Sequence, residues 1–117
     1  MDISREIYTA INRINKEKLN NKLCISVITK MELIIGCRNK IEQQKLNKFL
    51  QGFLIINVNE SISNQGCQLL EKYRLSHGLL IADALIAATA IILDIPLLSK
   101  NQSDYRFIDE INLLSYP

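Results

Sequence analysis

The sequence LLIADALIAATAIILDIPLLS, residues 79–99, is apolar over nearly its whole length, yet it carries an aspartate, Asp83, near its start. A buried, unpaired carboxylate is costly in free energy, so a protein that keeps one beside its core usually gives it a partner, a helix terminus or a metal ion. The stretch is not expected to span a membrane, because Asp83 and Asp94 lie within it and Pro96 ends its helical part. It predicts a core helix over residues 81–93, followed by a short strand.

The segments on either side of this helix predict the α/β class. Short apolar runs rich in β-branched residues indicate buried strands, and apolar residues at helical spacing indicate helices. The expected strands cover residues 23–28, 53–58, 97–99 and 111–115. Helices are expected over residues 3–20, 39–51, 60–76 and 81–93. A further helix is expected to begin at a Thr29 cap and to end near Gly36, and a short turn of helix is expected to open at Asn101. Strands that alternate with helices and are apolar throughout indicate a parallel sheet covered on both faces.

Length and composition are those of one soluble globular domain, residues 1–117. The chain of 117 residues is 48% hydrophobic and 22% charged, and its formal net charge of +2 favours a polyanionic partner only slightly. Its basic residues are concentrated in the first half, which fits either solvated helix faces or phosphate contacts. The first residues lack the pattern of a signal peptide, and the three cysteines show no C-x-x-C spacing. A reduced, cytoplasmic protein is expected.

Three acidic residues stand where a strand or loop enters a helix: Glu32, Asp83 and Asp104. In parallel α/β folds those junctions collect at one edge of the sheet, which is where such folds place their sites. Taken singly, each acid is explained by helix capping, since T-x-x-E is a capping box and an acid in a first turn gains up to about 1 kcal/mol from the helix dipole. Capping does not explain why Asp83 opens a helix that is apolar on every side. A cluster of the three acids explains it better.

Three carboxylates that converge repel one another unless a divalent cation neutralises them. An all-oxygen ligand set suits Mg²⁺ or Mn²⁺ rather than zinc, and the single histidine, His77, offers no competing zinc site with the scattered cysteines. Such a cation can activate a water for attack on a phosphodiester and stabilise the developing charge. Phosphodiester hydrolysis is therefore the chemistry that the three acids favour.

Three stretches resemble motifs of a known family: ISVITKMELIIG (residues 25–36), HGLLIADALIAATA (77–90) and LLSKNQSDYRFI (97–108). They resemble the three later motifs of PIN-domain nucleases, and in style the toxin ribonucleases of VapBC-type toxin–antitoxin pairs. The resemblance runs from about residue 3 to the C-terminus, and its most specific part is D-A-L-I-A-A-T-A, residues 83–90.

The resemblance implies roles for particular residues. It makes Glu32, Asp83 and Asp104 metal-binding catalytic acids, Ser99 the small hydroxyl residue at a strand end, and Asn101 the amide near the metal water. Ser99 and Asn101 are explained equally well as a strand-end hydroxyl and a helix cap. The resemblance also implies a three-layer α/β/α fold around a parallel sheet of order 3-2-1-4-5, an RNA substrate, an antitoxin partner that buries the active site, and a homodimer.

The start of the sequence departs from the family pattern. Members normally begin with a strand that ends in D-T-N or D-T-S and supplies the first metal-binding aspartate. Here the sequence starts MDISREI, and Asp2 aligns with a position after that strand, so Asp2 is not expected to be the missing ligand. The absent strand would lie in the middle of the sheet. Three explanations stay open: an upstream start codon, a degraded toxin without activity, or a gap filled by closure of the sheet or by a strand from a partner or a second copy.

The departure leaves two functions to compare. The first is a Mg²⁺- or Mn²⁺-dependent endoribonuclease of the toxin type, impaired if the first aspartate is absent. The alternative is a noncatalytic PIN-like remnant that binds an antitoxin or a second copy of itself through the apolar faces of helices 3–20 and 39–51.

Overall fold

The structure is a computed structural model that describes residues 23–116, so the predicted helix 3–20 lies outside the described residues. The chain divides into two compact units, residues 1–57 (unit 1) and 58–117 (unit 2). Each unit builds its own part of the parallel β-structure, and each is described by itself below. The organisation of residues 1–117 as one domain stays a prediction.

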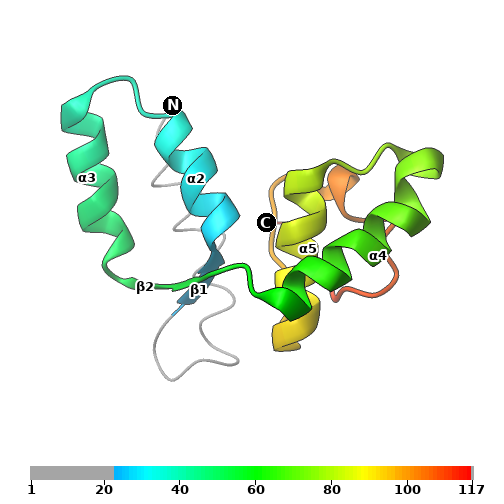
Figure 1. Ribbon diagram of the computed structural model, residues 1–117. Helices are drawn as coiled ribbons and strands as arrows, with labels where there is room; N and C mark the ends of the chain where they lie inside the picture. The colour runs from blue at the N-terminus through cyan, green and yellow to red at the C-terminus, as the bar shows by residue number, and fades with distance from the viewer. Residues whose placement is uncertain (1–22, 117) are drawn as a thin grey trace. The chain divides into compact units, whose positions relative to one another are not determined.

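Unit 1 is built on two parallel strands, β1 (Leu23–Ser26) and β2 (Phe53–Ile56), paired in the register Leu23 to Phe53 and Ser26 to Ile56. Parallel strands need a long crossover, and here two helices supply it. These helices are α2 (Val27–Ile35) and α3 (Lys40–Leu50), which follow β1 and precede β2 in the chain. The two helices lie side by side (Figure 1). Among residues 23–116, no further strand pairs with this two-stranded sheet.

The start of α2 corrects the sequence interpretation. Ser26 is its N-cap, and the Ser26 hydroxyl accepts a hydrogen bond from the backbone N–H of Ile28 at 3.1 Å. Val27 and Ile28 are therefore helical, although their β-branched side chains favoured a strand over residues 23–28. The predicted cap at Thr29 is wrong, because Ser26, three residues earlier, caps the helix through its bond to the N–H of Ile28. The predicted strand 53–58 is likewise shorter, ending at Ile56.

Unit 2 packs α4 (Glu60–His77) against α5 (Ile81–Leu93). Asn59 caps α4 by accepting from the N–H of Ile62 at 2.9 Å, and Gly78 ends α4 in the left-handed conformation with φ of 72°. The predictions of a helix over 60–76 with an Asn59 cap, a helix over 81–93 and a stop at His77-Gly78 are thus confirmed. Gly78 is suited to this position because it has no Cβ to oppose a positive φ.

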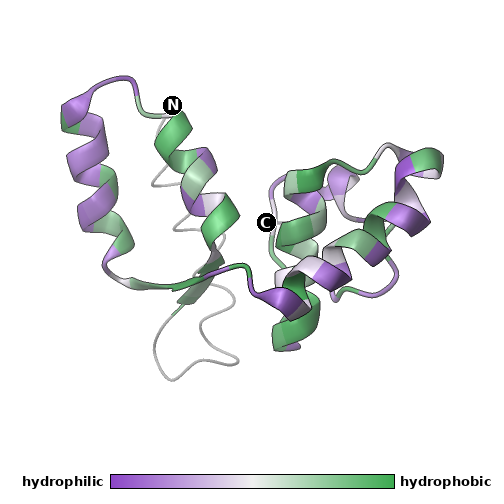
Figure 2. Ribbon diagram, in the orientation of Figure 1, coloured by the Kyte–Doolittle hydropathy of each residue, from purple (hydrophilic) through white to green (hydrophobic). Residues whose placement is uncertain are grey.

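The core of unit 2 accounts for the buried part of the apolar helix α5, whereas Ile81, Ile92 and Leu93 of the same helix are exposed. Figure 2 shows α5 coloured hydrophobic over most of its surface, whereas α4 carries hydrophilic residues between its apolar ones. Five side chains of the two helices have no exposed surface: Ile62, Leu69, Ala84, Ala87 and Ala88. The close approach of the helices is seen at Gly66 of α4, where an added Cβ would lie 3.0 Å from a side-chain carbon of Leu85 in α5. No helix in the described range 23–116 is long and apolar enough to cross a membrane.

The chain that follows α5 returns to β-structure. The N–H of Leu97 donates to the carbonyl of Asn112 at 2.9 Å, and the N–H of Leu114 donates to the carbonyl of Leu97 at 2.9 Å, which makes one parallel bridge between Leu97 and Leu113. The predicted strands 97–99 and 111–115 are therefore paired as expected but contract to this bridge. All the strand pairing described is parallel, and the α/β class is confirmed.

The two pairs match the expected strand order in part. In the order 3-2-1-4-5, strand 2 pairs with strand 3 and strand 4 with strand 5, and these are the pairings seen in unit 1 and unit 2. Neither pairing involves strand 1 of that order. The order of the sheet as a whole stays a prediction.

Candidate active site

Asp83 is the third residue of α5, a position that places its carboxylate beside the first amides of the helix. Leu80, the N-cap, makes no side-chain capping bond, so the polar group at this helix start is supplied from within the first turn. The carboxylate is half-buried, and its Oδ1 accepts a hydrogen bond from the hydroxyl of Tyr105 at 3.1 Å. The aspartate of the apolar stretch is therefore at a helix terminus and has a phenolic partner.

The charge of Asp104 acts on the Asp83 carboxyl. Burial raises the pKa of the Asp83 carboxyl above its ordinary value, the hydrogen bond from Tyr105 opposes this rise, and the negative charge of Asp104 adds to it. Asp104 is exposed and ends the short 3₁₀ turn η1 (Gln102–Asp104). Two of the three predicted acids are thus brought together by unit 2, one from a helix start and one from the loop after the Leu97 bridge.

The loop that carries Asp104 is fixed by hydrogen bonds from its own residues. The side-chain amide of Gln102 donates to the carbonyl of Ser99 at 2.6 Å and to that of Leu114 at 3.2 Å. The Ser99 hydroxyl accepts from the N–H of Asn101 at 3.0 Å, a local turn that serine commonly forms. These bonds hold the start of η1 to the strand segments on both sides of it.

The structure gives Ser99 and Asn101 different roles. Ser99 shapes the turn through its hydroxyl, as the strand-end interpretation expected. Asn101 is exposed and stands at the N-cap position of the short helical turn η1, as predicted, but its side chain makes no capping hydrogen bond to η1. A direct catalytic role for either residue stays a prediction.

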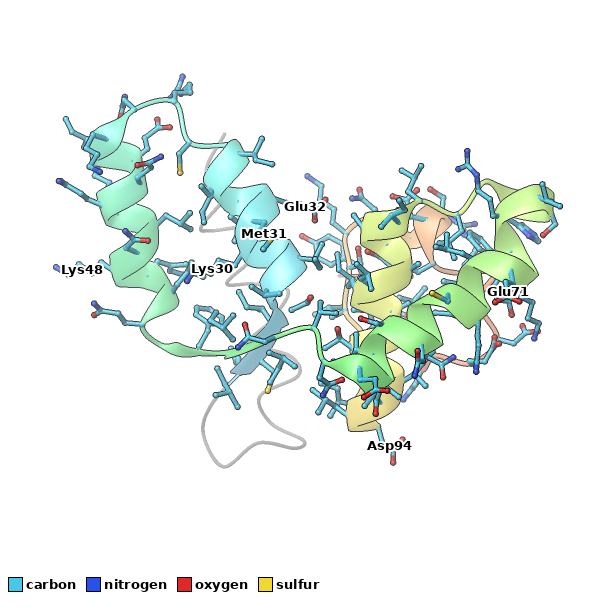
Figure 3. The ribbon with its side chains drawn as sticks, viewed as in Figure 1. Lys30, Met31, Glu32, Lys48, Glu71 and Asp94 are labelled. Atoms are coloured by element: carbon cyan, nitrogen blue, oxygen red, sulfur yellow. The ribbon has the colours of Figure 1, made fainter. Side chains whose placement is uncertain are left out.

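Glu32 belongs to unit 1. It is the sixth residue of α2 and exposed, so its predicted place in a first helical turn is wrong, for the reason that Ser26 starts the helix early. Figure 3 shows Lys30 and Glu32 leaving α2 on different sides, as expected for residues two apart on a helix. The convergence of Glu32 with Asp83 and Asp104 stays a prediction.

The donors that unit 2 brings together fit a hard divalent cation. Within the described residues, no group of three or more histidine, cysteine, aspartate or glutamate side chains could hold a metal ion. Mg²⁺ commonly takes only one or two carboxylates, with water and substrate oxygens in its other positions. Asp83 and Asp104 would supply two carboxylates, and a cation would neutralise the negative charge that Asp104 places near Asp83.

Two residues at this site were missed by the sequence analysis. Tyr105 directly follows Asp104 and is 4% exposed, which signals a side chain held in the core beside the acid. Gln102 lies inside the Asn101-x-x-Asp104 pattern, where a long amide can reach the backbone on both sides of the loop. The sequence offered nearness to Asp104 as a signal for both, but no spacing rule that identified their partners.

Known families and structures match most of the chain. Residues 3–110 match the PIN domain family. Ribonuclease VapC1 of Methanocaldococcus jannaschii is 35% identical over 94 residues, covering 79% of this chain and 68% of that protein. Ribonuclease VapC19 of Mycobacterium tuberculosis is 38% identical over 98 residues, covering 81% of this chain and 78% of that protein.

Solved structures agree with the sequence relatives. A toxin–antitoxin complex from Klebsiella pneumoniae aligns with a TM-score of 0.72 at 28% identity, over 92% of this chain and 82% of that one. VapBC2 from Rickettsia felis, bound to a DNA fragment from its promoter, aligns with a TM-score of 0.74 at 27% identity, over 96% of this chain and 86% of that one. The α/β fold, the helix of Asp83 and these matches together show that the chain belongs to the PIN-domain family and is similar to its VapC toxins.

Proposed function

We propose that this chain is a metal-dependent endoribonuclease of the toxin type, in which Glu32, Asp83 and Asp104 hold Mg²⁺ or Mn²⁺. The observation that carries the proposal is the half-buried Asp83 carboxylate at the start of α5, which is hydrogen-bonded to Tyr105, the residue that directly follows Asp104. The similarity to ribonucleases VapC1 and VapC19 supports RNA as the substrate.

The residues of the site have separable tasks in this proposal. When bound, the divalent cation would activate an attacking water and stabilise the negative charge on the phosphodiester oxygens. Asp83 and Asp104 hold that cation, and Ser99 and Gln102 keep the loop of Asp104 in place through the hydrogen bonds described above. In this proposal Asn101, which is exposed in the loop, contacts the substrate or the attacking water.

Partners follow from the same relatives. The solved structures include a toxin–antitoxin complex and a VapBC pair, which supports an antitoxin as the protein partner of this chain. We further propose a homodimer and a cytoplasmic location. The free thiols of Cys24, Cys37 and Cys67 support a reducing compartment.

The test is RNA cleavage by the purified chain. A pool of cellular RNA is incubated with Mn²⁺ or with EDTA, and new 5′ ends are mapped by sequencing. We expect cuts at defined positions that need Mn²⁺ and disappear in Asp83→Asn. Asp94→Asn is the matched control, because it makes the same chemical change just beyond the opposite end of α5, at an αL position (φ 53°) that asparagine tolerates well. Cleavage that persists in EDTA, or in Asp83→Asn, would contradict the proposal.

A noncatalytic partner-binding module is the second candidate. One observation favours it: α2 exposes three large apolar side chains, Met31 at 51%, Ile34 at 39% and Ile35 at 82%. Such side chains on a short helix are typical of a surface that a partner covers. On this interpretation the purified chain binds the protein encoded by a small neighbouring reading frame, Met31→Ser and Ile35→Ser weaken that binding, and Mn²⁺-dependent cleavage is absent. Binding that is unaffected by both substitutions would remove this candidate's support.

A further inference from the structure

Tyr105 joins the two acids of the candidate site. It follows Asp104 directly in the chain, and its hydroxyl donates to Asp83 Oδ1 at 3.1 Å across 22 residues of sequence. The side chain is 4% exposed, so packing fixes the ring and gives its hydroxyl little freedom to turn to water. The segment that carries one acid therefore also holds the other.

The hydrogen bond leaves most of the Asp83 carboxylate available. An ionised carboxylate has two oxygens and about four acceptor positions, and the phenol occupies one of those on Oδ1. Carboxylates that bind metals are commonly oriented by such outer hydrogen bonds, because a ligand that is already turned to the right angle loses less entropy on binding. A buried tyrosine suits this task better than a mobile surface side chain.

We propose that Tyr105 is a positioning residue, whose hydroxyl holds the Asp83 carboxylate in the orientation in which Asp83 and Asp104 bind one divalent cation. The inference rests on the proposed function, and it adds a residue to which neither the acid pattern nor the family motifs assign this role. Tyr105 does not itself contact the cation or the RNA in this proposal.

The competing explanation is that the Asp83 carboxylate merely satisfies a buried hydroxyl. Tyr73 provides a matched control for it, being 5% exposed with a hydroxyl that donates to Glu110 Oε1 at 2.5 Å. Both tyrosines are thus buried phenols bonded to a carboxylate, but the carboxylate of Glu110 is paired with Lys72 rather than with a second acid. Loss of the Tyr73 hydroxyl should affect stability without affecting the metal site.

The test compares Mn²⁺ affinity in the wild type, Tyr105→Phe and Tyr73→Phe by calorimetry. Phenylalanine keeps the ring and removes only the hydroxyl. We expect Tyr105→Phe to bind Mn²⁺ roughly tenfold more weakly, at the lower end of what loss of an outer hydrogen bond costs a metal site. Tyr73→Phe should bind Mn²⁺ as the wild type does.

Thermal unfolding of the same proteins with and without Mn²⁺ gives a second readout. A purely structural role for Tyr105 lowers the melting temperature without metal and leaves the Mn²⁺-induced rise unchanged, whereas a positioning role reduces that rise. Equal Mn²⁺ affinity in Tyr105→Phe and wild type would overturn the inference and leave the proposed function standing. Absence of Mn²⁺ binding in the wild type would overturn both, so the two failures are distinguishable.

Discussion

The hydroxyl of Tyr73 donates to Glu110 Oε1 at 2.5 Å, and this bond ties the chain that follows η1 to the C-terminal half of α4. Lys72 pairs with the other oxygen of Glu110 at 3.2 Å, and the N–H of Asp109 donates back to the Tyr73 hydroxyl at 3.2 Å. Three bonds thus converge on two adjacent residues of α4. They anchor Asp109 and Glu110 to α4.

This network should make the stability of the protein depend on the ionisation of Glu110. Burial pushes the pKa of Glu110 upward, but the hydrogen bonds from Tyr73 and Lys72 outweigh it, and the pKa is lowered overall. A carboxyl group with a lowered folded pKa stabilises the protein above its unfolded pKa, and this contribution is lost as the pH falls through the folded pKa. We expect Glu110→Gln to lose roughly 1 kcal/mol at pH 7 and almost nothing in acid.

Urea unfolding at neutral and acid pH measures that difference. Asp109→Asn, which alters the neighbouring exposed carboxylate, serves as the control and should change stability little at either pH. A loss in Glu110→Gln that is the same at both values of pH would show that the network does not depend on the charge.

The position of the α2 cap gives a second prediction. Ser26→Ala removes the hydroxyl that accepts from the N–H of Ile28 and should cost about 1 kcal/mol of stability. Thr29→Ala should be neutral or slightly stabilising, because Thr29 lies within the helix, where alanine has the higher propensity. Denaturant midpoints of the two variants compare the positions, and a larger loss in Thr29→Ala would restore Thr29 as the cap.

Asp83 should destabilise the metal-free fold at neutral pH. Because its folded pKa is raised, the folded state binds a proton at a higher pH than the unfolded chain, and stability rises as the pH falls from the folded pKa to the unfolded value. The side-chain amide introduced by Asp83→Asn cannot ionise but can still accept from Tyr105. The variant should therefore be at least as stable as the wild type at pH 7 in EDTA.

The pH dependence of the melting temperature tests this sign. The advantage of Asp83→Asn should shrink as the pH approaches about 4, the ordinary value for aspartate. If the melting-temperature advantage of Asp83→Asn over the wild type grew as the pH fell, the fold would stabilise the ionised form of Asp83 and the predicted sign would be wrong.

Glu32 provides the test of the three-acid cluster. If it joins Asp83 and Asp104 at one cation, Glu32→Gln should weaken Mn²⁺ binding about tenfold or more. Glu71→Gln is a fitting control, since Glu71 is an exposed glutamate of α4 that belongs to no predicted site (Figure 3). Calorimetry that gives equal Mn²⁺ affinities for the two variants would leave Glu32 as a surface residue of α2.

Local signals in the sequence were enough to predict the bounds of most of the helices. The α5 helix has the predicted bounds 81–93, and α4 begins after Asn59 and ends at Gly78, because caps and left-handed glycines act through nearby backbone atoms. The boundary between β1 and α2 was mispredicted for a physical reason. Val27 and Ile28 favour a strand by their side chains, but the Ser26 cap and the helix that follows determine their conformation.

Long-range pairing was predictable only in outline. Parallel contact of the segments near 97 and 113 followed from the fold class, but nothing local determines that it contracts to a single bridge. The site shows the same division. Asp83 and Asp104 could be named from their places at helix starts, whereas the bond from Tyr105 to Asp83 depends on how the chain turns after η1 and has no local signal.

The central claim is that Asp83 belongs to a carboxylate site for a divalent cation, and calorimetric titration of Mn²⁺ into the full chain tests it most directly. The wild type and Asp94→Asn should bind Mn²⁺ with equal affinity, and Asp83→Asn should bind at least tenfold more weakly. No binding by the wild type, or equal binding by Asp83→Asn, would contradict the account and leave the aspartate of residues 79–99 as a residue of the α5 helix terminus alone.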